Sequence, residues 1–108
     1  MFRNLVLALV LVSIAGCSEK GSRPVVVGSK NFTESVILGE ILAQKLESAG
    51  CTVQRRQNMG GTFVVDKAMQ SGDLDSYVEY SGTALTAILQ QPILKDREQV
   101  DRLIRAAY

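Results

Sequence analysis

Residues 77–84 read Tyr-Val-Glu-Tyr-Ser-Gly-Thr-Ala, a pattern typical of a strand end, a tight turn at Gly82 and the first turn of a helix. This junction places the ring of Tyr80 and the hydroxyl of Thr83 where a strand passes into a helix, and ligands of α/β folds bind at that end of the sheet. Two similar junctions lie upstream, over residues 27–34 and 58–62. Because parallel strands carry such junctions on the same edge of a sheet, we expect the three to form one binding edge.

Three stretches predict the strands of a parallel sheet. Val25-Val26-Val27 is a continuous apolar run, which suits a strand buried on both faces. Two further strand patterns follow, with helical spacing between them, and this order predicts two right-handed βαβ units. The expected strands cover residues 24–27, 51–57 and 74–80. The predicted fold class is therefore α/β, with flanking helices.

Start signals mark the helices between and after these strands. Asn31, with Glu34 three residues later, imitates a capping box, and Asp96 is the expected cap of a last helix. Gly60-Gly61-Thr62 is expected to open the second helix, and a further helix is expected over 83–90. The apolar residues expected to form inner helix faces are Val36, Ile37, Ile41, Leu42 and Leu46 in the first helix, and Phe63, Val64, Ala68 and Met69 in the second.

The N-terminus has the pattern of a bacterial lipoprotein signal. Arg3 precedes an apolar run that is too short to span a membrane and ends in Ile14-Ala15-Gly16-Cys17, a tetrapeptide that resembles a lipobox. We therefore expect a signal peptide over 1–16, lipidation of Cys17, and a polar tether over 17–23. An ordinary signal peptide with a chance cysteine is the alternative. With Cys17 lipidated, Cys51 is expected to be a small buried thiol, the alternative being a disulfide to a second chain.

Composition excludes several classes of function. The chain of 108 residues has a net charge of +1 without a run of like charge, so a nucleic-acid surface is not expected. It contains no histidine and no nucleophile–base pair, which argues against an enzyme. Asp73, Asp75 and Glu79 form an acidic group, which we interpret as a solvated loop and strand end and not as a metal site. No cofactor is expected.

The junctions resemble those of the substrate-binding proteins of quaternary-amine ABC importers, the group that binds glycine betaine, carnitine and choline. The resemblance covers nearly all of residues 25–89. Its motifs are Val-Gly-Ser-Lys-Asn-Phe-Thr-Glu (27–34), Gly-Glu-Ile-Leu-Ala-Gln (39–44), Asn-Met-Gly-Gly-Thr (58–62) and Ser-Gly-Asp-Leu-Asp-Ser-Tyr-Val-Glu-Tyr-Ser-Gly-Thr-Ala-Leu (71–85). The resemblance implies a lobe of the type II periplasmic-binding-protein kind, a quaternary-ammonium ligand, permease and ATPase partners, and an extracytoplasmic, lipid-anchored location.

The resemblance also implies a ligand site. Tyr80 would be a ring of an aromatic cage, while Lys30 and Thr83 would be polar contacts. A quaternary ammonium has no N–H to donate, and the ring quadrupole of tyrosine is what recognises it. An amine at Lys30 and N–H groups at Gly61 and Thr62, where a helix begins, suit a carboxylate. Taken alone, Lys30 would be interpreted as a solvated lysine, and the glycines as a helix-start turn.

Members of this family are considerably longer than this chain. Residues 24–108 are therefore expected to be a partial N-terminal lobe with half of a cleft, with exposed apolar helix faces, a poorly protected sheet edge and millimolar affinity at best. The alternative function is a small lipoprotein that binds a protein partner through that apolar surface, without a ligand. No phosphate-binding loop occurs, so an ATPase would have to be another chain.

Overall fold

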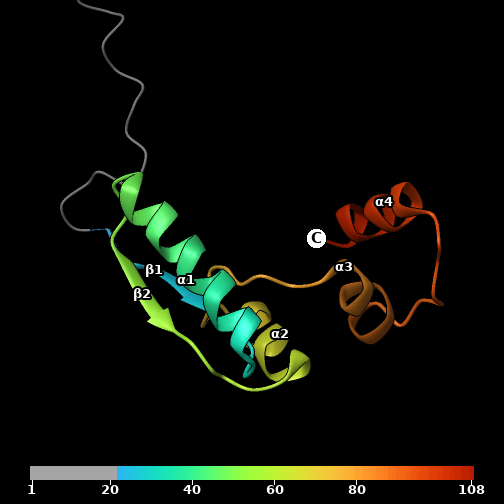
Figure 1. The fold of residues 1–108 in the computed structure, drawn as a ribbon, viewed down its shortest axis with the longest axis horizontal. Helices are drawn as coiled ribbons and strands as arrows, with labels where there is room; N and C mark the ends of the chain where they lie inside the picture. The colour runs from blue at the N-terminus through green and yellow to red at the C-terminus, as the bar shows by residue number, and fades with distance from the viewer. Residues whose placement is uncertain (1–21) are drawn as a thin grey trace, which may run out of the picture.

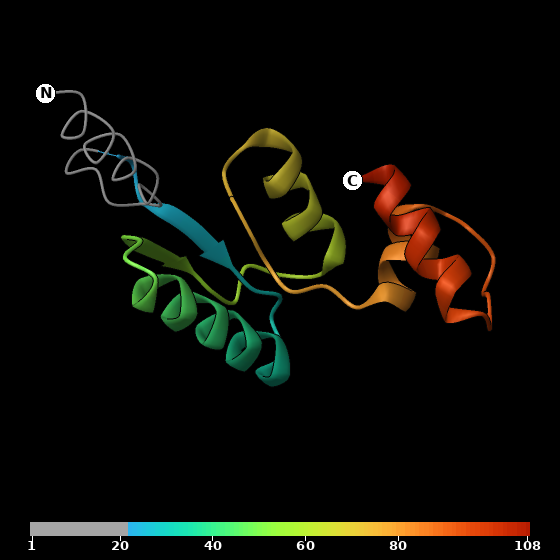
Figure 2. The same ribbon diagram turned by 90° about the horizontal axis from the view of Figure 1, so that it is seen from above.

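The computed structural model describes residues 22–108 and has two parallel strands with helices around them (Figure 1). β1 and β2 pair in the register Val25↔Val53 to Gly28↔Arg56. α1 connects the strands, and the two views place α1 on one side of the sheet and α2 on the other (Figure 2). The elements are β1 (Val25–Gly28), α1 (Thr33–Ser48), β2 (Val53–Arg56), α2 (Thr62–Ser71), α3 (Ser81–Thr83), the π-helix η1 (Ala84–Ile88) and α4 (Arg97–Ala107).

The predicted third strand is only partly present. The segment after α2 lies against β1, where the Gly28 amide donates to the Ser76 carbonyl at 2.9 Å. A single parallel bridge, Val27↔Ser76, is all that forms. β1 ends at Gly28, so residues 77–80 pass beyond the sheet without a neighbouring strand. The expectation of a strand over 74–80 is therefore wrong apart from the bridge at Ser76, and the second βαβ unit is not completed, while β1, α1 and β2 confirm the first.

The start of α1 differs from the expected capping box. The helix begins at Thr33, and its N-cap Phe32 makes no side-chain cap bond. The Asn31 amide instead donates to the Gly60 carbonyl at 2.9 Å. The Ser35 hydroxyl accepts from the Lys30 amide, also at 2.9 Å. The residues before α1 are thus held by contacts to their surroundings, and these replace the local cap.

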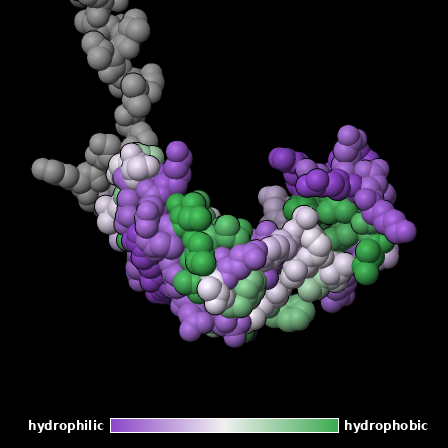
Figure 3. Space-filling view, viewed as in Figure 1, coloured by the Kyte–Doolittle hydropathy of each residue, from purple (hydrophilic) through white to green (hydrophobic). Residues whose placement is uncertain are grey.

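The inner faces of α1 and α2 were assigned incorrectly for several residues. Ile37 and Ile41 are 53% and 60% exposed, and Phe63 and Val64 are 68% and 54% exposed. The small residues Ser35, Gly39 and Ala43 are the buried residues of α1. Figure 3 shows hydrophobic residues gathered in patches on both sides of the hollow in this face of the molecule. The expectation of exposed apolar helix faces is confirmed.

The core is small and lies mainly between β1, α2 and the segment that follows α2. Val26, Val65, Ala68 and Leu74 form its buried cluster, and Tyr77 packs against it. Beyond the extended segment 77–80, the expected helix over 83–90 is realised as α3 and η1, and α4 contacts both. Among the described residues, no helix is long and apolar enough to cross a membrane.

Two sequence expectations about caps and charges have opposite outcomes. The predicted Asp96 cap is confirmed, because its carboxylate accepts from the amides of Glu98 and Gln99. Asp75, expected to be solvated, instead accepts from the Val26 amide at 2.7 Å and pairs with Arg23, the last residue of the predicted tether. The N-terminal end of the described chain is therefore bound to the fold.

Cys51 is buried, as expected, but it is part of a disulfide. The prediction of a reduced thiol at this position is therefore wrong. Cys17, the signal peptide over 1–16 and most of the tether lie outside the described residues.

Gly39 allows α1 to approach β1. A Cβ atom at this position would lie 3.1 Å from the Gly28 carbonyl oxygen, which is backbone and cannot move aside freely. We expect Gly39→Ala to lower the free energy of unfolding by about 1–3 kcal/mol through overpacking, although alanine favours helices. Gly82→Ala is the control, since a Cβ there meets nothing within 4 Å. Urea unfolding of both variants measures the difference, and equal stabilities would contradict the close approach.

Arg55 of β2 forms ion pairs with two glutamates of α1. Its guanidinium lies 2.7 Å from Glu40 and 2.7 Å from Glu47. The hydrogen bond from Arg55 is the main cause that lowers the pKa of Glu40 from 4.5 to about 2, and it also lowers the pKa of Glu47. A carboxylate whose pKa is lower in the folded than in the unfolded state stabilises the fold at any pH above the unfolded pKa. This stabilisation is lost as the pH falls from the unfolded pKa to the folded pKa.

We therefore expect the stability advantage of wild type over Arg55→Met to shrink between pH 4.5 and about pH 2. Thermal melts across this range measure it. Arg102→Met, which removes only an exposed pair at 4.0 Å from Glu98, is the control and should show no such change. If the difference in stability between wild type and Arg55→Met did not change with pH, the proposed contribution of these ion pairs would be contradicted.

Candidate functional site

The first two strand-to-helix junctions are joined by backbone contacts. The Met59 amide donates to the Ser29 carbonyl at 3.1 Å, and the Asn58 amide donates to the Ser29 hydroxyl at 2.8 Å. The second junction can turn at Gly60 because this residue has φ 136°, a backbone conformation that residues with a side chain rarely adopt. The expected common edge therefore exists for these two junctions.

A buried ion pair attaches the third junction to the first. The Lys30 ammonium lies 2.5 Å from the Glu79 carboxylate, and their side chains are only 5% and 12% exposed. The same carboxylate accepts from the Tyr80 amide at 2.8 Å and from the Tyr77 hydroxyl at 3.3 Å. The interpretations of Glu79 as a solvated acid and of an isolated Lys30 as a solvated lysine are therefore both wrong.

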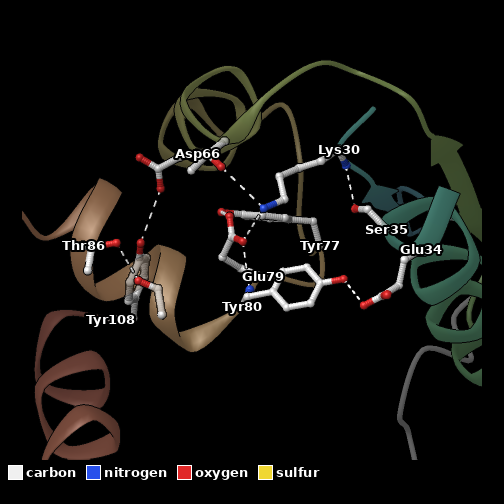
Figure 4. Close-up of polar contacts among 11 residues, drawn as sticks. Lys30, Glu34, Ser35, Asp66, Tyr77, Glu79, Tyr80, Thr86 and Tyr108 are labelled. Carbon is white, nitrogen blue, oxygen red and sulfur yellow. Dashed lines mark hydrogen bonds and ion pairs between the residues drawn. The ribbon is translucent and has the colours of Figure 1, made fainter. Parts of the chain in front are cut away.

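Two aromatic rings lie close to the same ammonium, and Figure 4 shows the Tyr80 side chain beside it. The Lys30 nitrogen lies 5.2 Å from the centre of the Tyr80 ring and 5.3 Å from the centre of the Phe32 ring. The two rings are tilted neighbours with centres 6.1 Å apart. These distances are within the range of cation–π attraction, so two ring faces and a cation already form one unit.

The other predicted site residues lie at different distances from this unit. The Lys30 ammonium donates to the Thr62 hydroxyl at 3.4 Å. Gly61 is the exposed N-cap of α2, directly before Thr62. Thr83 lies at the end of α3 and makes no side-chain hydrogen bond within the described part of the chain. The structure thus brings Lys30, Thr62 and Tyr80 together, places Gly61 beside them, and leaves Thr83 without a contact to them.

We call Lys30, Phe32, Thr62, Glu79 and Tyr80 the rim. The hydrogen bond to Glu34 is the main cause that raises the pKa of Tyr80 to about 12. Burial, followed by the charge of Glu79, raises the pKa of Tyr77. Both phenols are therefore neutral at physiological pH and keep the ring quadrupole that attracts cations.

Sequence reasoning did not assign Phe32 or Glu79 to the site. Phe32 directly precedes α1, and its place in the junction 27–34 is the sequence signal that could have identified its ring. Glu79 could have been found by pairing charges across junctions, since Lys30 and Glu79 each lie just beyond the sheet in neighbouring segments. Together with Thr62, these residues present rings, a hydroxyl and opposite charges, which suits binding of a small charged solute.

Comparisons with known proteins identify the family to which the chain is similar. The family described as the substrate binding domain of ABC-type glycine betaine transport systems matches residues 23–107. The glycine betaine-binding protein YehZ of Escherichia coli is 41% identical over 75 residues, which is 69% of this chain and 25% of that protein. The carnitine transport binding protein OpuCC of Listeria monocytogenes is 30% identical over 98 residues, or 89% of this chain and 32% of that protein.

A third relative is the ergothioneine transport permease/ergothioneine binding protein EgtU of Helicobacter pylori, 38% identical over 94 residues, with 86% of this chain and 16% of that protein covered. The structure of apo YehZ superposes with a TM-score of 0.73 at 35% identity and covers 80% of this chain and 31% of that one. The chain thus spans a third or less of the length of these relatives. The fold likeness confirms the predicted α/β architecture of a binding-protein lobe, and the chain belongs to the family of substrate-binding domains of ABC-type glycine betaine transport systems.

Proposed function

We propose that this chain acts in the solute-binding component of an ABC importer for quaternary-ammonium osmoprotectants such as glycine betaine, choline or carnitine. The observation that carries the proposal is the Lys30 ammonium, which lies beside the rings of Phe32 and Tyr80, 5.3 Å and 5.2 Å from their centres. This geometry supports a rim where ring faces recognise cations and where the carboxylate of a solute would compete with Glu79 for the Lys30 ammonium.

The relatives support the same chemistry. Glycine betaine, carnitine and ergothioneine, which appear in their names, all combine a trimethylammonium group with a carboxylate. In the proposed site, Tyr80 contacts the ammonium, while the carboxylate meets Lys30, the amides at Gly61 and Thr62, and the hydroxyl of Thr83. The helix α2 begins at this point, and its free N–H groups favour an anion.

The proposal includes partners and location. A permease and a separate ATPase would move the solute, because the sequence contains no phosphate-binding loop. The protein would act outside the cytoplasm, anchored by lipid at Cys17, and would not be an enzyme. The comparisons give no support for the alternative of a protein-binding lipoprotein without a ligand.

We expect glycine betaine to bind the purified chain with a millimolar Kd. Two ring contacts contribute about 0.5–2 kcal/mol each, and a millimolar complex corresponds to about 4 kcal/mol. Tyr80→Leu should weaken this binding about threefold or more, because it removes one ring face. Titration of the chain followed by NMR, with assigned signals for Lys30, Thr62 and Tyr80, measures the effect.

Tyr80→Phe is the matched control for this titration, since it keeps the ring and removes only the hydroxyl that binds Glu34. It should bind within about twofold of wild type. Binding that is unchanged in Tyr80→Leu, or an absence of shifts at the rim with glycine betaine, choline and carnitine alike, would refute the proposed function.

Lipid anchoring can be tested separately. The disulfide of Cys51 bears on this anchor: the chain has only two cysteines, so a thioether at Cys17 would require Cys51 to pair with a second chain. We expect mass spectrometry of the protein made in a bacterial host to find an acylated N-terminal peptide starting at Cys17, and Cys17→Ala to leave the membrane fraction. A peptide in which Cys17 is joined to Cys51 would contradict the anchor and leave the ligand proposal untouched.

A further inference from the structure

Ser29 lies where the first two strand-to-helix junctions and α1 meet. The residue is completely buried, with 0% of its surface exposed. A Cβ atom at Gly39 of α1 would lie 3.4 Å from the Cβ of Ser29, so the helix packs directly against it. Ser29 follows Gly28, the last residue of β1, and precedes Lys30 of the rim. It is therefore the direct neighbour of a rim residue, yet out of reach of any solute.

The polar groups of Ser29 connect it to both sides of the rim. Its amide donates to the Arg56 carbonyl at 3.3 Å, and its carbonyl accepts from the Met59 amide at 3.1 Å. Its hydroxyl accepts from the Asn58 amide at 2.8 Å and donates to the Lys30 carbonyl at 3.1 Å. One hydroxyl thus bonds to the residue that carries the ammonium and to the loop that leads to α2.

The backbone of Asn58 adopts a conformation that needs support. Its φ is 59°, in the left-handed region that residues other than glycine rarely adopt. Asparagine tolerates this region better than most residues, but the conformation still costs free energy that glycine would not lose. The hydroxyl of Ser29 accepts the amide of this same residue, shortly before α2 begins at Thr62. The hydrogen bond therefore holds the loop at its least favourable point.

We propose that Ser29 is a positioning residue, whose buried hydroxyl holds the loop before α2 in place relative to Lys30. Through this loop it sets where the N–H groups of Gly61 and Thr62 lie, which in the proposed site bind a carboxylate together with the Lys30 ammonium. That ammonium lies 3.4 Å from the Thr62 hydroxyl, so a small displacement of the loop separates the two. The inference rests on the proposed function and deepens it, because it assigns the geometry of the carboxylate contacts to a residue that the solute does not touch.

The first test needs no ligand. In the full chain, we expect Ser29→Ala to shift the amide NMR signals of Gly61 and Thr62 and to speed hydrogen exchange at the Asn58 amide, which loses its acceptor. The signals of Leu74, in the buried cluster, should stay in place. A displacement confined to the loop distinguishes positioning from a general loss of structure, and circular dichroism verifies that each variant is folded.

Ser35→Ala is the matched control variant. Ser35 is also buried, at 1% exposed, and its hydroxyl also bonds to Lys30, but by accepting from the Lys30 amide and without a bond to the loop before α2 (Figure 4). We expect this variant to leave the amide signals of Gly61 and Thr62 unchanged, although it too removes a buried hydrogen bond.

The second test compares glycine betaine with choline, which has the same cation but no carboxylate. Ser29→Ala should raise the Kd of glycine betaine about threefold and leave the Kd of choline within about 1.5-fold, because only the carboxylate contacts move. Adding Asn58→Gly to Ser29→Ala should restore most of the lost affinity, since glycine adopts the left-handed conformation without support. Asn58→Val disturbs the same loop from an exposed position and should reproduce the effect where Ser29→Ala does not fold.

The inference is overturned if Ser29→Ala leaves the signals of Gly61 and Thr62 unchanged, if it weakens choline as much as glycine betaine, or if Ser35→Ala acts equally. Unchanged loop signals, together with normal binding of glycine betaine at the rim, would overturn the role of Ser29 and leave the proposed function standing. A displaced loop in Ser29→Ala, with no response of the wild-type rim to glycine betaine, choline or carnitine, would support the positioning role and refute the proposed function.

Discussion

The ion pair between Lys30 and Glu79 is the interaction on which the rim depends. Both groups are almost completely buried, and desolvation of two charges opposes their attraction, so such a pair adds little net stability unless further hydrogen bonds satisfy it. Here the carboxylate also accepts from the Tyr80 amide and the Tyr77 hydroxyl, and the ammonium also donates to Thr62. The pair therefore fixes the relative positions of three segments that the short sheet alone does not hold together.

The parts of the fold that follow from local rules were predictable. The Asp96 cap, the start of α2 after Gly61 and the apolar β1 depend on nearby residues, and all are present. The failures have tertiary causes. Asn31 does not cap α1 because the helix begins at Thr33, which makes Phe32 the N-cap. Likewise, α1 buries Gly39 because its close approach to β1 leaves no room for a side chain there. Helical periodicity identifies an apolar face but does not say whether another element covers it.

The site was predictable to a similar depth. Lys30 and Tyr80 were expected at one edge of the fold, and the Lys30 ammonium does lie 5.2 Å from the centre of the Tyr80 ring, while their role in ligand binding stays a prediction. Glu79 was missed because its charge was considered with the neighbouring acids of its own segment and not with Lys30, which is 49 residues away.

The rim contains a cation of its own, the Lys30 ammonium, and this cation affects which solutes the rim could prefer. The Lys30 ammonium already occupies the faces of Phe32 and Tyr80, so a solute cation at the same faces would have to compete with a charge that is bonded to Glu79. A carboxylate on the solute changes this balance, because it offers Lys30 a second anion while the solute's own cation takes a ring face. In the proposed site, a zwitterionic solute would therefore lose less than a simple cation on entering the rim.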